Sequence, residues 1–544
     1  MKKYLIPTLT VLGVAMGLFI GMSLCQHANA QRIVIQNGQL QLEESKVDRL
    51  LQLMESAYVD QIDVDSITDE VMTELVQKLD PHSAYIPKED LEMVNSELAG
   101  SFSGIGVQFT LQQDTVNIVA VIAGGPCEGV GVLAGDKIVS VDDSVFVGKK
   151  MNNEKVMKTL RGPKGTDVKL GIKRAGTPET LAFTVTRGDI PVTSVDAKFI
   201  IESKGERLKK DKIGFVRVNK FGETTYKEFI TALAELHAKG ATKYIVDLRE
   251  NSGGYMDQAI KMANEFLLGG AMIVYSEGRA YPRYEAKATG SGRFKNVPLA
   301  VLIDDFSASA SEIFAGAMQD NDRATIIGRR SFGKGLVQQQ MAFSDGSAVR
   351  LTVARYYTPS GRCIQKPYTL GDQKDYEKEL MERFEHGEQF SADSIHFSDT
   401  TVYRTRKGRI VHGGGGIMPD VFVGRDTTLN TPWYNKCVNL AYTYQFAFQY
   451  TDKHRQELSA FKDWQALEKH LNNQNILREF VAFAAEKDVA PDEEQIAKSK
   501  PLITRLLNAY IVRNILGDEG FFPLYERDDD ITKKAVEVLA NTSK

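Results

Sequence analysis

Cysteine, histidine and tryptophan are scarce in this chain, and their scarcity excludes several kinds of protein. Only four cysteines and two tryptophans occur among 544 residues. Removal of residues 1–30 would leave Cys127, Cys363 and Cys437, and an odd number cannot form a complete disulfide framework. The eight histidines are scattered, without a His-Glu-x-x-His motif or another paired-ligand spacing. We therefore expect neither a disulfide scaffold nor a metal site, and the sequence indicates no cofactor.

An excess of charge of either sign is also lacking. Lys and Arg total 67 against 71 Asp and Glu, which gives a formal net charge of −4. A nucleic-acid surface needs a concentration of basic residues, so none is predicted. The content of 42% hydrophobic and 25% charged residues is typical of a globular protein. Because 544 residues exceed what one hydrophobic core accommodates, we expect three or four domains.

Only the N-terminus carries a long hydrophobic run. Lys2 and Lys3 precede YLIPTLTVLGVAMGLFIGMSLC, and Ala28-Asn29-Ala30 has the small-x-small form of a signal-peptidase site. These features predict export, with residues 1–30 as a signal peptide. The run is also nearly long enough to span a bilayer, so an uncleaved anchor is the alternative. We therefore expect a protein that is periplasmic or anchored to the inner membrane, with membrane association only through this segment.

Hydrophobic periodicity divides the rest of the chain into four regions. Residues 31–98 show helical spacing with one apolar face, which favours packing on another domain or a homodimer through the helical regions. Residues 99–190 contain β-type runs between glycines and predict a small β-rich domain. Residues 191–425 alternate strand-like and helical runs and predict an α/β domain. Residues 426–544 are again helical and rich in aromatic residues. The apolar face of the first region consists of Val47, Leu50, Leu51, Met54 and Tyr58.

Ser309 lies in the segment DDFSASASEIFAGAMQD, where we expect a strand to end near Ile303 and a helix to begin near Ser311. One interpretation is a helix cap, because Ser309-x-x-Glu312 fits a capping box, and this segment alone favours it. The other is a nucleophile at a strand-to-helix turn. Exposed N–H groups and the positive end of the helix would there stabilise a developing oxyanion.

A serine nucleophile needs a base, and the chain has neither a Gly-x-Ser-x-Gly elbow nor a histidine in a suitable context. Lys334 lies in GRRSFGKG, which matches the front of a phosphate-binding loop. Gly335 stands where such a loop needs the hydroxyl that holds Mg²⁺. A lysine becomes a base when burial lowers its pKa, and a decrease of about three pKa units costs about 4 kcal/mol. Gln338 would orient the amine without adding charge. The segment thus predicts a plain turn, a nucleotide loop or a catalytic lysine.

Two further patterns allow alternative interpretations. Gly253 and Gly254 in VDLRENSGGYMDQA either form a strand-to-helix turn that needs positive φ or bring a backbone N–H close to a substrate. Ser459-Ala-Phe-Lys462 fits the Ser-x-x-Lys pattern of penicillin-binding enzymes. The accompanying Ser-Asp-Asn and Lys-Thr-Gly motifs are absent, which argues against that class.

Taken together, the motifs of this chain resemble those of the carboxyl-terminal processing proteases, also called tail-specific proteases. The resemblance runs from about residue 40 to Val423. It is carried by LDPHSAYI, GSFSGIGV, LRGPKGT, DLRENSGG, SASASEIFAGAMQDNDRATIIG, SFGKGLVQ and YYTPSGRCIQ. Their order and spacing are far more specific than any one motif. The helical region from residue 426 lies outside the resemblance.

The resemblance implies a crotonase/ClpP-like α/β protease core and a set of site residues. Ser309 would be the nucleophile, Lys334 the general base and Gln338 the residue that positions it. The oxyanion hole would be formed by the N–H of Ala310 and one from Gly253 or Gly254. Ser307 and Ser311 would be structural, Ser311 as a helix cap.

The β-rich region is identified, by the same resemblance, as a PDZ domain. Its carboxylate-binding loop would be Gly104, Ile105, Gly106 and Val107, and the strand beginning at Val107 would pair with an extended peptide. Without the resemblance, GIGV is an ordinary glycine-rich turn. The sequence thus predicts an exported, ATP-independent serine endopeptidase that selects protein or peptide substrates by their free C-terminal tails. The alternative is a PDZ-containing binding protein with an inactive protease domain.

Overall fold

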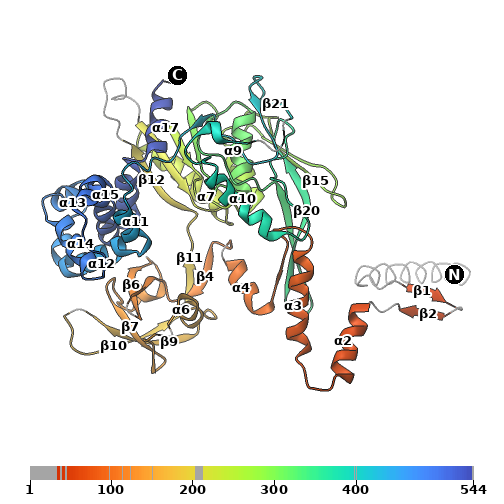
Figure 1. Ribbon diagram of the computed structural model, residues 1–544, viewed down its shortest axis with the longest axis horizontal. Helices are drawn as coiled ribbons and strands as arrows, with labels where there is room; N and C mark the ends of the chain where they lie inside the picture. The colour runs from red at the N-terminus through yellow and green to blue at the C-terminus, as the bar shows by residue number, and fades with distance from the viewer. Residues whose placement is uncertain are drawn as a thin grey trace, which may run out of the picture. The chain divides into compact units, whose positions relative to one another are not determined.

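The computed structural model describes residues 33–541, apart from 37–38, 43–45, 97, 113, 123, 150, 175, 202–211, 397–398 and 400 (Figure 1). The predicted leader, residues 1–30, therefore lies outside the described residues. The chain divides into two compact units, Met1–Leu75 and Val76–Lys544. Within the described residues, no helix is both long enough and apolar enough to cross a membrane.

The N-terminal region is less helical than predicted. β1 (Ile33–Gln36) and β2 (Gln39–Leu42) form an antiparallel hairpin, and β3 (Ala84–Ile86) is a third strand. The prediction of helix throughout residues 31–98 is therefore wrong for these segments. The run Ile33-Val34-Ile35 explains the first strand, because β-branched side chains favour extended backbone. The region's helices are α2 (Lys46–Ala57), α3 (Val64–Gln77) and α4 (Lys88–Ser96).

The β-rich region forms a twisted antiparallel sheet in the order β10-β9-β7-β6-β5, with β8 paired to β7. Alternate residues such as Ile118, Ile138 and Leu170 point into its core. β4 pairs with β11 beside this sheet. The elements are β4 (Ser101–Gly104), β5 (Val107–Gln112), β6 (Thr115–Val121), α5 (Pro126–Gly129), β7 (Lys137–Val141), β8 (Ser144–Val145), α6 (Asn153–Leu160), β9 (Asp167–Lys173), β10 (Leu181–Thr186) and β11 (Gly188–Pro191).

A second, central sheet confirms the predicted α/β region. Its order is β12-β13-β14-β17-β18-β23, antiparallel between β12 and β13 and parallel from β13 onward. Parallel strands covered on both faces are continuously apolar, as LAVLI in β17 illustrates. The strands are β12 (Val195–Ile201), β13 (Lys212–Val218), β14 (Ala241–Asp247), β17 (Leu299–Ile303), β18 (Thr325–Gly328) and β23 (Val421–Phe422).

Each face of the central sheet has its own hydrophobic core. On β14, Tyr244 and Val246 pack with Phe229 and Phe314 from the helices of one face. Ile245, between them, packs in the other core with helices of the C-terminal region. This alternation follows from the two-residue period of a strand. The helices of the first face are α7 (Thr225–Ala238), α8 (Met256–Asn264) and α9 (Ala310–Asp320).

The C-terminal region is helical, as predicted, and we call residues 426–541 the C-terminal module. Its side chains Leu507, Phe522 and Ile531 belong to the same core as the second face of the sheet. The module therefore completes the layered core. Its helices are α11 (Pro432–Asn439), α12 (Tyr442–Leu458), α13 (Trp464–Leu471), α14 (Ile476–Ala485), α15 (Glu493–Leu516), α16 (Asp518–Glu526) and α17 (Asp530–Asn541).

A third sheet lies beside α9 and has the order β16-β15-β20-β19, with β3 paired to β20. β19 and β20 form a hairpin that turns at Asp345-Gly346. The strands are β15 (Met272–Glu277), β16 (Tyr284–Lys287), β19 (Leu336–Ala342) and β20 (Ala348–Tyr357). The helix α10 (Gln373–Glu385), the 3₁₀ turn η1 (Ala392–Ser394) and the strands β21 (Tyr403–Arg404) and β22 (Ile410–Val411) follow.

Candidate active site

Ser309 lies in a strained turn between the end of β17 and the first residue of α9. Its φ of 54° and ψ of −112° are costly for a residue with a side chain, and such strain gathers at functional sites. Ser307 anchors the loop, because its Oγ donates to Leu248 O at 2.8 Å and accepts from Asp304 N–H at 2.9 Å. The predicted structural role of Ser307 agrees with this contact.

The helix cap differs from the prediction. Ser311 is the second residue of α9, and its Oγ donates to Asn251 O at 2.9 Å, so its predicted role as a cap is wrong. The helix begins one residue earlier than expected, which places Ser309 at the N-cap. The Ser309 N–H donates to Glu312 Oε2 at 2.8 Å, the glutamate half of a capping box. Ser309, which is half-buried, thus occupies the N-cap position, in a turn that lies directly before a helix N-terminus.

Lys334 has the surroundings of a lysine whose neutral form is favoured. Its Nζ donates to Gln338 Oε1 at 2.9 Å, and Gln338 Nε2 donates to His82 O at 2.5 Å. No carboxylate lies within ion-pair distance of this amine in the described part of the chain. Burial lowers the pKa of Lys334, and the positive charge of Arg350 lowers it further. Asp80 and Glu312 oppose the shift of that pKa without reversing it.

Two buried side chains join the main chains of Ser309 and Lys334. Glu312 Oε2 accepts from both backbone N–H groups, at 2.8 Å from Ser309 and 2.9 Å from Lys334. The Tyr356 hydroxyl lies within hydrogen-bonding distance of both carbonyl oxygens, at 3.1 Å from that of Ser309. Residues from two separate turns are therefore fixed side by side. Within the described residues, no hydrogen bond joins Ser309 Oγ directly to Lys334 Nζ, and such bonds often close only when substrate binds.

Glu312 accepts four hydrogen bonds within the site. Its Oε1 accepts from Ser331 Oγ at 2.6 Å and from Gly333 N–H at 2.7 Å, in addition to the two bonds of Oε2. The residue is fully buried, and this burial raises its pKa to about 7 although four donors point at it. The carboxylate thus organises the turn that carries Lys334 around the start of α9.

The glycine loop of residues 247–254 lies against the turn that carries Ser309. Gly253 and Gly254 have φ of 106° and 136°, as the turn interpretation required. A Cβ on Gly253 would lie 2.7 Å from Ser309 Cβ and 3.0 Å from Ala310 N, so only glycine permits this approach. The Gly253 N–H is engaged by Asn251 Oδ1 at 2.9 Å. The N–H groups of Gly254 and Ala310 have no hydrogen-bond partner within the described residues.

The GIGV segment forms the loop between β4 and β5. Gly104 ends β4, Val107 begins β5, and Gly106 has φ of 79°. A Cβ on Gly106 would lie 3.2 Å from Gly125 Cα, which adds a packing reason for glycine. β5 is an outer strand of its sheet and, among the residues that the structure describes, pairs only with β6, so its other edge is open for an added strand.

Comparison with known proteins decides which family these features represent. The model of Peptidase family S41 matches residues 212–377, and the PDZ domain model matches residues 103–186. The chain is 35% identical over 343 residues to the carboxy-terminal processing protease CtpA of Bacillus subtilis (strain 168), covering 62% of this chain and 71% of that protein. The chain belongs to the carboxy-terminal processing protease family. It is accordingly a serine peptidase with a PDZ domain that binds peptide or protein.

Other relatives of this protease family extend the comparison. The carboxy-terminal-processing protease of Bartonella bacilliformis is 35% identical over 357 residues, covering 64% of this chain and 78% of that protein. The solved photosystem II D1 C-terminal processing protease is 25% identical, covers 73% of this chain and 91% of its own, and has a TM-score of 0.38. A family of unknown function matches residues 433–517, within the C-terminal module.

The prediction of site residues missed His82, which belongs to the quoted motif LDPHSAYI. Asp80 Oδ1 accepts from the N–H groups of His82 and Ser83, which fixes the turn that presents the His82 carbonyl to Gln338. The imidazole lies 2.8 Å from the Tyr376 hydroxyl. Burial, followed by the charge of Lys334, lowers the pKa of His82 to about 4, so it stays neutral beside the amine. The sequence signal that could have indicated this turn is Asp80, because an aspartate followed by polar residues favours a turn.

Two alternative sites disagree with the structure. The loop ending at Gly335 leads into strand β19, whereas a phosphate-binding loop must lead into a helix N-terminus. Ser459 and Lys462 lie exposed just beyond α12, where Lys462 Nζ donates to Ser459 O. Neither arrangement supports nucleotide binding or a Ser-x-x-Lys enzyme of the penicillin-binding type.

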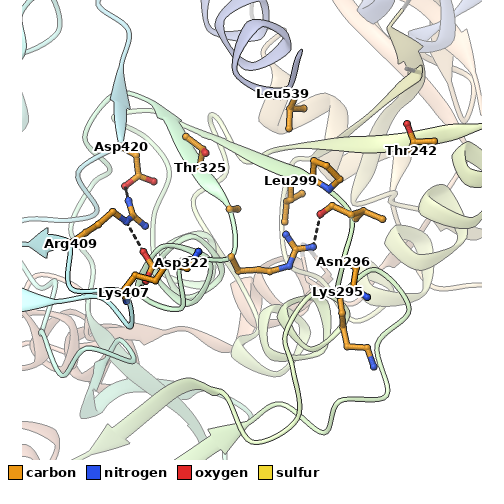
Figure 2. A pocket seen from close by; sticks show the side chains of 14 residues that line it. Thr242, Lys295, Asn296, Leu299, Asp322, Thr325, Lys407, Arg409, Asp420 and Leu539 are labelled. Carbon is orange, nitrogen blue, oxygen red and sulfur yellow. Dashed lines mark hydrogen bonds and ion pairs between the residues drawn. The ribbon is translucent and has the colours of Figure 1, made fainter. Parts of the chain in front are cut away.

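A cavity of about 860 Å³ lies at the N-terminal ends of three central strands, near Thr242 in β14, Leu299 in β17 and Thr325 in β18 (Figure 2). The glycine loop and Ser309 follow the opposite, C-terminal ends of β14 and β17. Arg409, on its wall, is paired with Asp322 at 2.6 Å and with Asp420. These charges satisfy one another. In the described ranges, no group of three His, Cys, Asp or Glu side chains is arranged to hold a metal ion.

Proposed function

We propose that this protease is an ATP-independent serine endopeptidase in which Ser309 and Lys334 form the nucleophile–base pair and Gln338 positions the base. The observation that carries the proposal is the environment of the Lys334 amine. The amine lies outside ion-pair distance of carboxylates and is bonded to a neutral amide, and the main chain of Lys334 is tied through two buried side chains to the main chain of Ser309. Such an amine can lose its proton near neutral pH.

The chemistry follows from these positions. Ser309 Oγ attacks the scissile carbonyl carbon while its proton passes to Lys334 Nζ, which forms a tetrahedral intermediate. The unpaired N–H groups of Ala310 and Gly254 would hold the oxyanion, whereas the N–H of Gly253 is already engaged. The C–N bond then breaks, and Lys334 returns its proton to the leaving amine. A water molecule attacks the acyl-enzyme, its proton passes to the lysine, and Ser309 is released with a proton regained.

The test of this proposal compares wild type with Ser309→Ala. A fluorophosphonate or sulfonyl fluoride probe should label wild type, and mass spectrometry should place the adduct on Ser309. The Ser309→Ala variant should be unlabelled and should cleave no peptide. Labelling elsewhere, or wild-type turnover by the variant, would disprove the assignment. A wild type that binds peptide without labelling or cleavage would instead establish the alternative, a binding protein with an inactive protease domain.

We further propose that the PDZ domain captures the free C-terminal tail of a substrate. Gly104 to Val107 would cradle the terminal carboxylate with backbone N–H groups, and the open edge of β5 would pair with the tail. A peptide that ends in a carboxylate should therefore bind more tightly than the same peptide ending in an amide. Fluorescence anisotropy can compare the two. Equal affinities would contradict recognition of the terminus.

The location and organisation of the chain complete the proposal. Residues 1–30 would direct export to the periplasm or anchor the protein to the inner membrane, and the regions 31–98, 99–190, 191–425 and 426–544 would be its domains. A homodimer through the helical regions is supported by α2, which buries none of its residues and leaves Val47 and Leu50 each 57% exposed. A Val47→Lys/Leu50→Lys variant should be monomeric by light scattering. A dimer that survives it would refute this surface.

A further inference from the structure

The C-terminal module reaches the glycine loop through one buried arginine. Arg249 follows β14 by two residues and belongs to the glycine loop. Its guanidinium donates to both oxygens of Asp247, at 2.9 and 2.7 Å. It also donates to two carboxylates of the module, at 2.7 Å to Glu526 and 2.8 Å to Asp529. The arginine therefore joins the loop, its own strand and the junction of α16 and α17.

This junction is a closed network rather than a surface ion pair. Arg249, Glu526 and Asp247 are all buried, and Thr532 Oγ1 donates to Glu526 Oε2 at 2.7 Å. Arg217 lies beside it, with Nη1 3.3 Å from Asp247 Oδ2. A guanidinium in this setting holds its partners in fixed directions, because its planar donors match carboxylate geometry. The glycine loop on one side of the network and the junction of α16 and α17 on the other are consequently held in fixed positions.

A short chain of hydrogen bonds connects Arg249 with the nucleophile turn. The next residue, Glu250, has φ of 60°, and its N–H donates to Asp304 Oδ1 at 2.9 Å. Asn251 then accepts from Gly253 N–H through its side chain and from Ala308 N–H through its carbonyl, at 3.0 Å. A displaced Arg249 would therefore displace the peptide groups that precede Gly254.

We propose that the C-terminal module positions the glycine loop for catalysis through Arg249, with Glu526 and Asp529 as positioning residues. This inference rests on the proposed function, since it assigns the Gly254 N–H to the oxyanion hole. The competing explanation is that the network only stabilises the fold, as buried ion clusters often do.

The opposite end of α17 offers a matched control. There the buried Lys243 Nζ donates to Leu539 O at 2.7 Å. Lys243 lies near the start of β14 and Arg249 just beyond its end, so the same helix and strand are joined at two points. Leu539 lines the cavity at the N-terminal ends of the central strands, whereas Ser309 follows the C-terminal end of β17 (Figure 2). A substitution of Lys243 therefore weakens attachment of the module far from the glycine loop.

The experiment compares wild type with two full-length variants, Glu526→Gln/Asp529→Asn and Lys243→Met. The Tm of each protein is measured first, and kcat and KM are then measured for one peptide substrate at a temperature below the lowest Tm. The double variant removes both charges of the C-terminal module that face Arg249, keeps Asp247 and keeps the side-chain shapes. We expect kcat to fall about 10- to 100-fold with KM within about twofold, because one well-placed oxyanion donor is worth about 10²- to 10³-fold. The pH at which the rate rises as the Lys334 amine loses its proton should be the same in the double variant as in wild type. Lys243→Met should keep kcat within about twofold despite a lower Tm.

The inference is overturned if the double variant keeps the wild-type kcat, or if Lys243→Met lowers kcat equally. Asp529→Asn alone, at a carboxylate that is 27% exposed, repeats the test in milder form should the double variant not fold. In that single variant a smaller fall of kcat at constant KM is expected, and an unchanged kcat counts against the inference. Ser309→Ala separates the two proposals. Residual turnover in that variant would defeat the proposed function, whereas its inactivity beside a fully active double variant would defeat only the role of the module.

Discussion

Replacement of Gln338 by glutamate tests how the protein keeps the Lys334 amine neutral. Gln338 Oε1 lies 2.9 Å from Lys334 Nζ and carries no net charge. The Gln338→Glu substitution would put a carboxylate at the same point and favour the protonated amine. Two unit charges about 3 Å apart interact by about 5 kcal/mol at an effective dielectric constant of ~20. If desolvation of the new carboxylate removes half of this, the pKa of Lys334 still rises by about two units at ~1.36 kcal/mol per unit.

The assay is kcat/KM for one peptide from pH 6 to 11. In wild type the rate should rise with pH through the pKa of Lys334, because only the neutral amine accepts the proton of Ser309. In Gln338→Glu the same inflection should lie about two pH units higher, and the rate near pH 7 should be about 100-fold lower. The loss should diminish as the pH increases.

Gln338→Met is the matched control for this prediction. It removes the bonds to Lys334 Nζ and His82 O without adding charge, so it should lower the rate without raising the inflection. An inflection in Gln338→Glu at or below that of wild type would refute the argument. It would mean that the amine does not sense the charge of its neighbour, and that Lys334 is not the titrating base.

Two further predictions concern the same site. Lys334→Arg should have the activity of Ser309→Ala while folding normally, because arginine cannot give up its proton at these pH values; peptide turnover above that background would contradict the lysine base. Glu312→Gln should flatten the pH dependence of stability, measured as Tm between pH 4.5 and 7. Since burial raises the pKa of Glu312 from 4.5 to about 7, the native state retains a proton in this window that the unfolded chain has lost. The contribution of Glu312 to wild-type stability therefore falls as pH rises through this window, and equal slopes of Tm against pH for the two proteins would contradict this.

Strands buried on both faces were the most predictable part of the fold. The run KIGFVRV coincides with β13, because a short apolar run bounded by polar residues is typical of a buried strand in an α/β protein. The hairpin of β1 and β2 was missed because glutamines interrupt its apolar pattern. The cap on α9 was misplaced by two residues, because three of the five residues in SASAS are serines able to cap a helix.

The site could be predicted only as far as its motifs reach. Ser309, Lys334 and Gln338 lie within short, recognisable segments. The contacts that fix them are long-range: the His82 carbonyl that meets Gln338 is 256 residues away in the chain. The carboxylate of Glu312 reaches Gly333 and Lys334 across 21 and 22 residues. No local pattern specifies such pairs, because they arise from the packing of the turn before β19 on α9 and of the turn before β3 on β19.

The order of synthesis gives α17 a particular significance. This helix lies on the second face of the central sheet through Ile531 and Ala535, yet it is made after every strand of that sheet. A chain interrupted before residue 529 would lack Ile531 and Ala535 in that core and would leave Arg249 without Asp529 and Thr532. Partial translation products of this gene should consequently cut neighbouring proteins more slowly than the full-length chain, because the contacts of Asp529 and Thr532 with Arg249 form only after every strand of the sheet has been made.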